Sequence, residues 1–144
     1  MSEKNHPKLS VAKQFISAIP HSIDLGMRVD AVSDGKVTLS IPYDERFIGD
    51  PETGVLHGGV VTALLDTAAG SAVIAHPLSA GGTATIDLRI DYMRPAKPHQ
   101  RITATAECYR VTRSVAFVRA TAMDEGDDPV AMATGAFTVE RNDE

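Results

Sequence analysis

The sequence is poor in the residues that mark several classes of protein. It contains one cysteine, Cys108, and no tryptophan. One cysteine excludes an internal disulfide framework, and its position in an alternating pattern predicts a buried core residue rather than a nucleophile. No stretch approaches the roughly 18 uncharged apolar residues that cross a bilayer, so no membrane association is expected. The polar residues 1–8 are not followed by an apolar run with a cleavage site, which predicts a cytoplasmic protein.

Positive charge is scarce as well. The 14 Lys and Arg residues stand against 19 Asp and Glu residues, and the net charge of −5 argues against a nucleic-acid partner. The five histidines show no ligand spacing, so no metal and no other cofactor is expected. Residues 89–119 are the exception, because they contain seven basic residues and only two acidic ones. This local excess suits a small polyanionic ligand, although basic side chains on the solvent face of strands would give the same pattern.

The 144 residues fit one domain, residues 1–144, with residues 1–8 and 141–144 expected to be flexible. Apolar residues at helical spacing in residues 9–19 predict a short amphipathic helix that covers something larger. The turn sequence Ser-Asp-Gly at residues 33–35 lies between two alternating segments, which predicts a hairpin of two strands.

Residues 58 to about 76 predict the central element of the fold. They are apolar on almost every side and too long for a strand, so we expect a buried helix that ends at Pro77. Strands with period-two alternation follow, at residues 84–92, 101–111, 115–123 and 130–139. Because no helices alternate with these strands, the fold class is α+β, with an antiparallel sheet curled around the helix. One sheet cannot cover a helix that is apolar all round, so dimerisation is expected.

A carboxylate, Asp66, stands in the middle of this apolar helix. An unpaired charge there would cost on the order of several kcal/mol, so the residue needs an explanation. Its neighbours on the same helix face, Gly59, Thr62, Ala63 and Gly70, are all small, which predicts a trough that a ligand can enter closely. The alternatives are a salt-bridged structural aspartate or a simple helix–helix contact.

The tripeptide His57-Gly58-Gly59 stands where a loop becomes this helix. Backbone N–H groups of both glycines are expected to be free at the positive end of the helix dipole, where they can stabilise a developing oxyanion. His57 can act as a further donor, although capping the helix is the ordinary role of such a histidine. Nine residues separate His57 from Asp66, or roughly 13 Å of helix. If both residues serve one reaction, they must come from two subunits whose helices lie antiparallel.

Three segments match a known pattern. They are GVLHGG at residues 54–59, LLD at residues 64–66 and DYMRPA at residues 91–96. With these segments in this order, the chain resembles the PaaI-like hotdog-fold acyl-CoA thioesterases over most of its length. The resemblance implies a hotdog fold, in which an antiparallel sheet wraps around a long central helix, and hydrolysis of acyl-CoA to free acid and CoA. It also implies a homo-oligomer, a dimer with shared active sites that pairs into a tetramer.

The resemblance further implies roles for single residues. Asp66 would attack the thioester carbon or activate a water molecule, the amide of Gly58 would bind the carbonyl oxygen, and His57 would assist. Thr85, at the start of the next strand, would help to position the water. Family members usually carry Asn or Gln a few residues before the LHGG segment, whereas this chain has Asp50, which donates no amide hydrogen bond.

The family places the phosphates of CoA on basic residues at subunit edges. Arg94, Lys97 and Arg113 lie in predicted turns where they can reach such a ligand, and Ser114 can add a hydroxyl group. A hairpin turn explains Arg113 and Ser114 equally well. The acyl group, medium-chain or aromatic, would lodge between the sheet and the neighbouring subunit.

Two other functions fit parts of the pattern. A hotdog dehydratase or hydratase acting on acyl thioesters would need a histidine placed as a base, whereas His57 beside two glycines suits an oxyanion turn better. A non-catalytic acyl-CoA sensor would lack a catalytic acid and would usually carry a DNA-binding extension. The presence of Asp66 and the length of 144 residues argue against a sensor.

Overall fold

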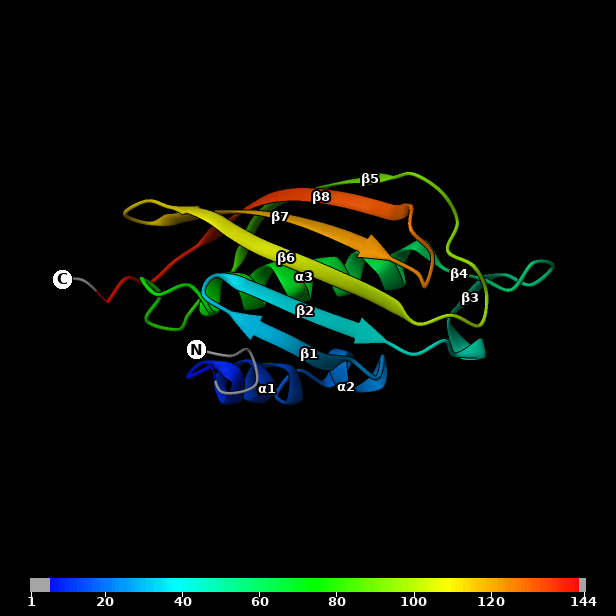
Figure 1. Cartoon of the computed structure of the whole chain (residues 1–144), viewed down its shortest axis with the longest axis horizontal. Helices are drawn as coiled ribbons and strands as arrows, with labels where there is room; N and C mark the ends of the chain where they lie inside the picture. Colours follow the sequence, from blue (N-terminus) through cyan, green and yellow to red (C-terminus); the bar gives the residue numbers. More distant parts are fainter. Residues whose placement is uncertain (1–5, 143–144) are drawn as a thin grey trace.

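The computed structural model describes residues 6–142, in which one antiparallel sheet curls around a long helix, α3 (Gly58–Ile74) (Figure 1). The order of strands across the sheet is β1-β2-β6-β7-β8-β5. These strands are β1 (Arg28–Ser33), β2 (Lys36–Ile41), β5 (Thr85–Tyr92), β6 (Ile102–Val111), β7 (Val115–Met123) and β8 (Pro129–Thr138). The other elements are α1 (Leu9–Ser17), α2 (Pro20–Asp24), the 3-10 helix η2 (Glu45–Phe47) and a small ribbon of β3 (Ile48–Asp50) and β4 (Val55–Leu56).

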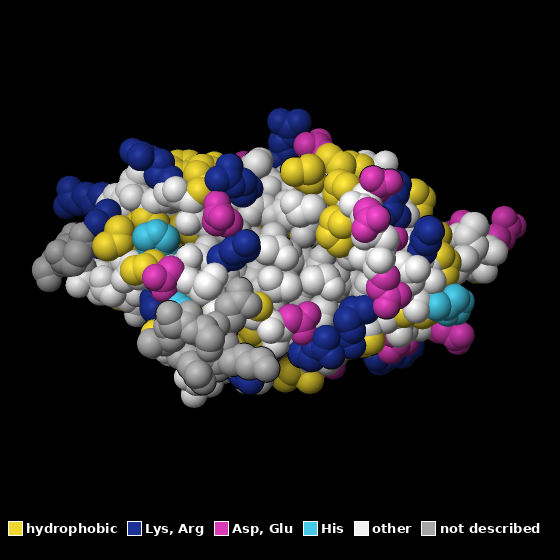
Figure 2. Space-filling view, viewed as in Figure 1, with side chains coloured by type: hydrophobic (Ala, Val, Ile, Leu, Met, Phe, Trp, Pro, Cys, Tyr) yellow, Lys and Arg dark blue, Asp and Glu magenta, His cyan; other side chains and the backbone are white. Residues whose placement is uncertain are grey.

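The sheet turns a face of small side chains toward α3. Ala104 and Ala106 of β6 are fully buried and alternate with less buried residues, which is the period of a strand with one covered face. Short side chains let the helix approach closely, and Leu64 of α3 is completely enclosed there. Figure 2 looks onto the opposite face, whose middle is largely uncharged. Thr38 and Thr105 lie on it, with their hydroxyl groups 3.2 Å apart.

The C-terminal end of α3 is closed by a cation from the start of the chain. The ammonium group of Lys8 donates to the carbonyl oxygens of Ile74 at 2.7 Å, His76 at 2.8 Å and Ser79 at 3.1 Å. Ile74 is the last residue of α3, where carbonyl groups have no partner inside the helix, and a positive charge opposes the negative end of the helix dipole. Lys8 therefore fixes the first residues of α1 against the end of the central helix.

Both described ends of the chain make specific contacts. His6 Nε2 lies 2.7 Å from a carboxylate oxygen in the β1–β2 turn, and Arg141 pairs with Ser79 in an isolated β-bridge. Of the ends expected to be flexible, residues 6–8 and 141–142 are described and have partners in the fold. The remaining residues of those expected ends, 1–5 and 143–144, lie outside the described residues.

The predicted helices and strands are confirmed, with boundaries shifted by at most two residues. The additional elements, α2, η2 and the β3–β4 ribbon, were not predicted. Cys108 is a buried core residue, as expected, and burial raises the pKa of its thiol to about 11. Among the described residues, no helix combines the length and apolar character needed to cross a membrane.

A buried ion pair joins the connection after β5 to the turn between β7 and β8. Arg94 donates from Nη1 and Nη2 to the two carboxylate oxygens of Asp124, at 2.7 and 2.8 Å. The Asp124 side chain is fully buried and also accepts from the amides of Lys97 and Gly126. The hydrogen bonds from Arg94 hold the pKa of Asp124 well below its usual range.

Asp124→Asn is expected to lower the melting temperature at pH 7 by roughly 5–10 °C, because it leaves a partly buried guanidinium without its counter-ion. The folded-state pKa of Asp124 is depressed, so its carboxylate stabilises the fold above the unfolded pKa of about 3.9 and loses this effect as pH falls further. The difference from wild type should be complete above about pH 5 and shrink below it. Thermal melts from acidic to neutral pH measure this difference. Asp128→Asn, in the same turn but exposed, is the control, and a difference independent of pH would contradict the prediction.

Candidate active site

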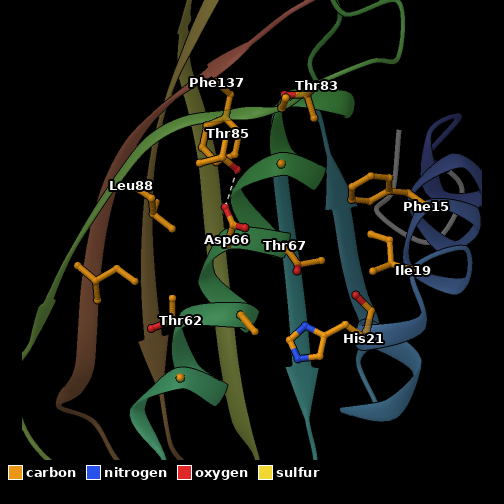
Figure 3. A pocket seen from close by; sticks show the side chains of 16 residues that line it. Phe15, Ile19, His21, Thr62, Asp66, Thr67, Thr83, Thr85, Leu88 and Phe137 are labelled. Atoms are coloured by element: carbon orange, nitrogen blue, oxygen red, sulfur yellow. Dashed lines mark hydrogen bonds between the residues drawn. The ribbon is translucent and has the colours of Figure 1, made fainter.

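A cavity of about 660 Å³ opens along the face of α3 that carries Asp66 (Figure 3). Its floor is made by small or short residues of α3, namely Gly59, Thr62, Ala63 and Gly70. These are the residues that helical spacing placed on one face with Asp66. The predicted trough therefore exists as a cavity.

The walls of this cavity come from two distant parts of the chain. Phe15 of α1 and Ile19, just before α2, stand on one side. Leu88 and Ile90 of β5 and Phe137 of β8 stand on the other. Apolar walls with a few polar groups are typical of small-molecule sites. The sequence predicted a covering helix here but did not predict that it lines a cavity. The spacing of four residues between Phe15 and Ile19 was the signal that could have shown it.

The carboxylate of Asp66 is anchored through one of its oxygens. Thr85 Oγ1 donates a hydrogen bond of 2.7 Å to Asp66 Oδ1 (Figure 3). Within the described residues Oδ2 has no hydrogen-bond partner. Thr85 therefore lies on the side of β5 that meets α3, which strand alternation alone had left open. The arrangement leaves Oδ2 able to attack a carbon atom or to accept a proton from water.

His57 caps the first turn of α3. Its Nδ1 accepts a hydrogen bond of 2.9 Å from the amide of Gly59, so the expectation that both glycine amides are free is wrong for Gly59. Across the described part of the chain the amide of Gly58 has no partner, which leaves it as an open donor at the positive end of the helix. Because Nδ1 accepts, a neutral His57 ring carries its proton on Nε2, where it can serve as a second donor.

Tyr92 of β5 ties the sheet to the start of α3. Its hydroxyl donates to the carbonyl oxygen of Gly58 at 3.0 Å and contacts the hydroxyl of Thr62. Thr62 donates to the same carbonyl at 3.2 Å. Thr62 thus both lines the cavity and fixes the first turn of the helix. The HGG and DYMRPA segments, 34 residues apart at Gly58 and Tyr92, meet at this point.

Asp66 and His57 do not reach the same atom within one subunit. Nine residues of α3 separate them, a rise of roughly 13 Å. His57 lines an adjoining hollow, which shares Gly59 and His21 with the cavity that contains Asp66. A reaction that uses both residues on one carbonyl group therefore requires two subunits.

Asp50 lies outside the cavity. Its carboxylate accepts hydrogen bonds from the amide of Glu52 at 3.0 Å and from the hydroxyl of Thr53 at 2.9 Å. Both contacts shape the turn that joins β3 to β4. Its position offers no support for the predicted contact with substrate.

The basic residues expected at CoA do not form one cluster. Arg94 donates to Asp124 and to nearby carbonyl groups, which gives it a structural role in the fold. Lys97 and Arg113 are both exposed, but Lys97 precedes β6 and Arg113 follows it, with Ser114 alongside. The strand between them spans about 33 Å, so both cannot hold one phosphate within a subunit.

Comparison with known proteins identifies the family. A family model described as the thioesterase superfamily matches residues 53–131, which include α3, β5, β6 and β7. The chain belongs to the thioesterase superfamily. The match contains all three segments on which the resemblance was based.

Similar thioesterases and solved structures define the branch of the superfamily. The medium/long-chain acyl-CoA thioesterase YigI of Escherichia coli K12 is 30% identical in an alignment of 142 positions that covers 90% of this chain and 91% of YigI. A crystal structure of a Pseudomonas aeruginosa protein, 42% identical, superposes with a TM-score of 0.84 over 93% of this chain and 100% of the other. The PaaI protein of E. coli, from the phenylacetic acid degradation operon, is 20% identical and shares the fold, with a TM-score of 0.77 over 90% of this chain and 93% of PaaI. The PaaI-like hotdog fold is confirmed, and the chain is a thioester hydrolase.

Proposed function

We propose that this thioesterase hydrolyses a medium-chain or aromatic acyl-CoA to the free acid and CoA, with Asp66 as its catalytic carboxylate. The observation that carries the proposal is the hydrogen bond from Thr85 to Asp66 beside a cavity with apolar walls. It leaves one carboxylate oxygen next to a space suited to an acyl group. The name of YigI as a medium/long-chain acyl-CoA thioesterase supports the same substrate class.

Two reaction courses use Asp66 in the same place. In the first, Oδ2 attacks the thioester carbon, the thiolate of CoA leaves, and water hydrolyses the resulting mixed anhydride. In the second, Asp66 takes a proton from a water molecule that attacks the same carbon. In both courses Thr85 fixes the orientation of the carboxylate, and negative charge develops on the carbonyl oxygen of the substrate.

Donors for that oxygen are available at the start of α3. The open amide of Gly58 and the Nε2–H group of His57 suit this task, and a donor of this kind typically contributes about 3–4 kcal/mol to the transition state. Within one subunit they lie roughly 13 Å from Asp66. We therefore assign them to the partner subunit, with the two α3 helices antiparallel across a two-fold axis.

The uncovered edge of the sheet supports such a dimer. β5 is an edge strand, and Ile86, Tyr92 and Met93 on or beside it are 56%, 51% and 51% exposed. An open edge strand with exposed apolar side chains is rarely left uncovered in a stable protein. We propose that β5 faces its copy in a dimer, and that dimers pair into tetramers. In an antiparallel dimer, Lys97 of one subunit and the pair Arg113 and Ser114 of the other can serve a single CoA.

The test is an assay of the purified protein against short-chain, medium-chain, long-chain and aryl acyl-CoAs, in which a thiol-trapping reagent follows the CoA released. We expect release of thiol, fastest with medium-chain or aryl substrates. Acyl-CoAs that bind, as measured by calorimetry, but are not cleaved would favour a sensor instead. Loss of 2-enoyl-CoA absorbance without release of thiol would favour a hydratase.

A further inference from the structure

One side of the cavity is formed by α1 together with the residues around the start of α2. Phe15 and Ile19 both line it, and Figure 3 shows them across the cavity from Thr85 and Asp66, with Thr67 in between. The two side chains are four residues apart and present apolar surface to the same space. An acyl group with its thioester carbon at Asp66 that extended toward α1 would end against them.

This side of the cavity is a fixed part of the fold. Ala12 and Ile16, the neighbours of Phe15 on α1, are 1% and 5% exposed and belong to the main core, against which Phe15 also packs. Lys8, at the N-terminal boundary of α1, donates to three carbonyl groups at the end of α3. A helix held by core packing and by a cation at its start keeps Phe15 in place. It can therefore act as a rigid stop rather than a loose cover.

We propose that Phe15 and Ile19 set the maximum length of the acyl chain, so that α1 and the residues before α2 determine the specificity of the enzyme. The inference rests on the proposed function, because it names the specificity-determining wall of the same site. Each methylene that enters the cavity is expected to improve kcat/KM about fourfold, from the usual free energy of burying a methylene group. Beyond the length at which the chain meets Phe15, this gain stops.

Substitutions at Phe15 test the proposal in two directions. Phe15→Ala removes the ring and is expected to move the preferred acyl chain to a greater length, raising kcat/KM at least tenfold for the first substrate that wild type excludes. Phe15→Trp enlarges the stop and is expected to move the preference to a shorter chain. Opposite shifts from one position are not produced by partial unfolding. Val11→Ala, an exposed position of the same helix outside the cavity, is the matched control and should leave the preference unchanged.

The length profile is measured twice, as kcat/KM and as affinity by calorimetry, over a graded series of saturated acyl-CoAs. The same preferred length in wild type, Phe15→Ala and Phe15→Trp would overturn the proposal while leaving thioester hydrolysis intact. If wild type binds the series without cleaving it, the proposed function fails, but the affinities still show whether the length limit follows residue 15. A wild type that neither binds nor cleaves the series overturns both.

Discussion

Asp66→Asn is expected to lower kcat for the best acyl-CoA by at least about 100-fold while leaving its affinity within a few-fold. An amide has nearly the shape of the carboxylate and can still accept the hydrogen bond from Thr85. It is neither a nucleophile toward a thioester nor a base for water. Single-turnover and steady-state rates, together with binding measured by calorimetry, separate these effects.

The control for this variant is Asp127→Asn, because Asp127 is an exposed aspartate in the turn between β7 and β8 that does not line the cavity. It should retain wild-type activity. Undiminished turnover by a folded Asp66→Asn variant would remove Asp66 from the mechanism. For wild type, ¹⁸O from labelled water in the Asp66 carboxylate after a single turnover would establish the nucleophilic course. Label enters this carboxylate only if Asp66 attacks the thioester and water then attacks the Asp66 carbon of the anhydride.

The main elements of the fold could be predicted because each is long enough to show its period. The helix from Gly58 and the strands β5 to β8 have eight or more residues each, so their patterns repeat several times. The β3–β4 ribbon has strands of three and two residues, and α2 has five residues. Segments of that length contain at most about one and a half repeats, too few to reveal a period. Their structure depends on contacts with the rest of the fold, such as the bond from the amide of His57 to the carbonyl of Phe47.

The candidate site was predictable in its residues but not in how they use their hydrogen bonds. Small residues around Asp66 indicated a trough, because helical spacing alone determines which residues share a face. Whether the amide of Gly59 stays free depends on the rotamer of His57, and whether Thr85 reaches Asp66 depends on how β5 crosses α3. Neither follows from sequence spacing. The role of Arg94 was equally hidden, since its partner Asp124 lies 30 residues further on.

Gly58→Pro is expected to lower kcat by roughly 100- to 1,000-fold, the usual effect of losing one oxyanion donor. Proline removes the amide hydrogen and little else here, because Gly58 is the first residue of α3, where proline is well tolerated. His57, with φ −58° and ψ 136°, already has the backbone conformation favoured before proline. Gly58→Ala keeps the hydrogen and is the control. Its added Cβ would lie 3.6 Å from the ring of Tyr92, an ordinary contact.

Mixing the two inactive variants tests whether the active site is shared between subunits. A heterodimer of Asp66→Asn and Gly58→Pro has one site with both substitutions and one site with neither, if each site takes its carboxylate from one subunit and its donors from the other. Random assortment from equal amounts then restores about one quarter of wild-type activity. Co-expression with two different affinity tags isolates the heterodimer, whose activity should be about half that of wild type. An isolated heterodimer with no more activity than its parents would mean that Asp66 and Gly58 act within the same subunit. Because the two residues lie far apart on α3, they would then have to act in different steps of the reaction.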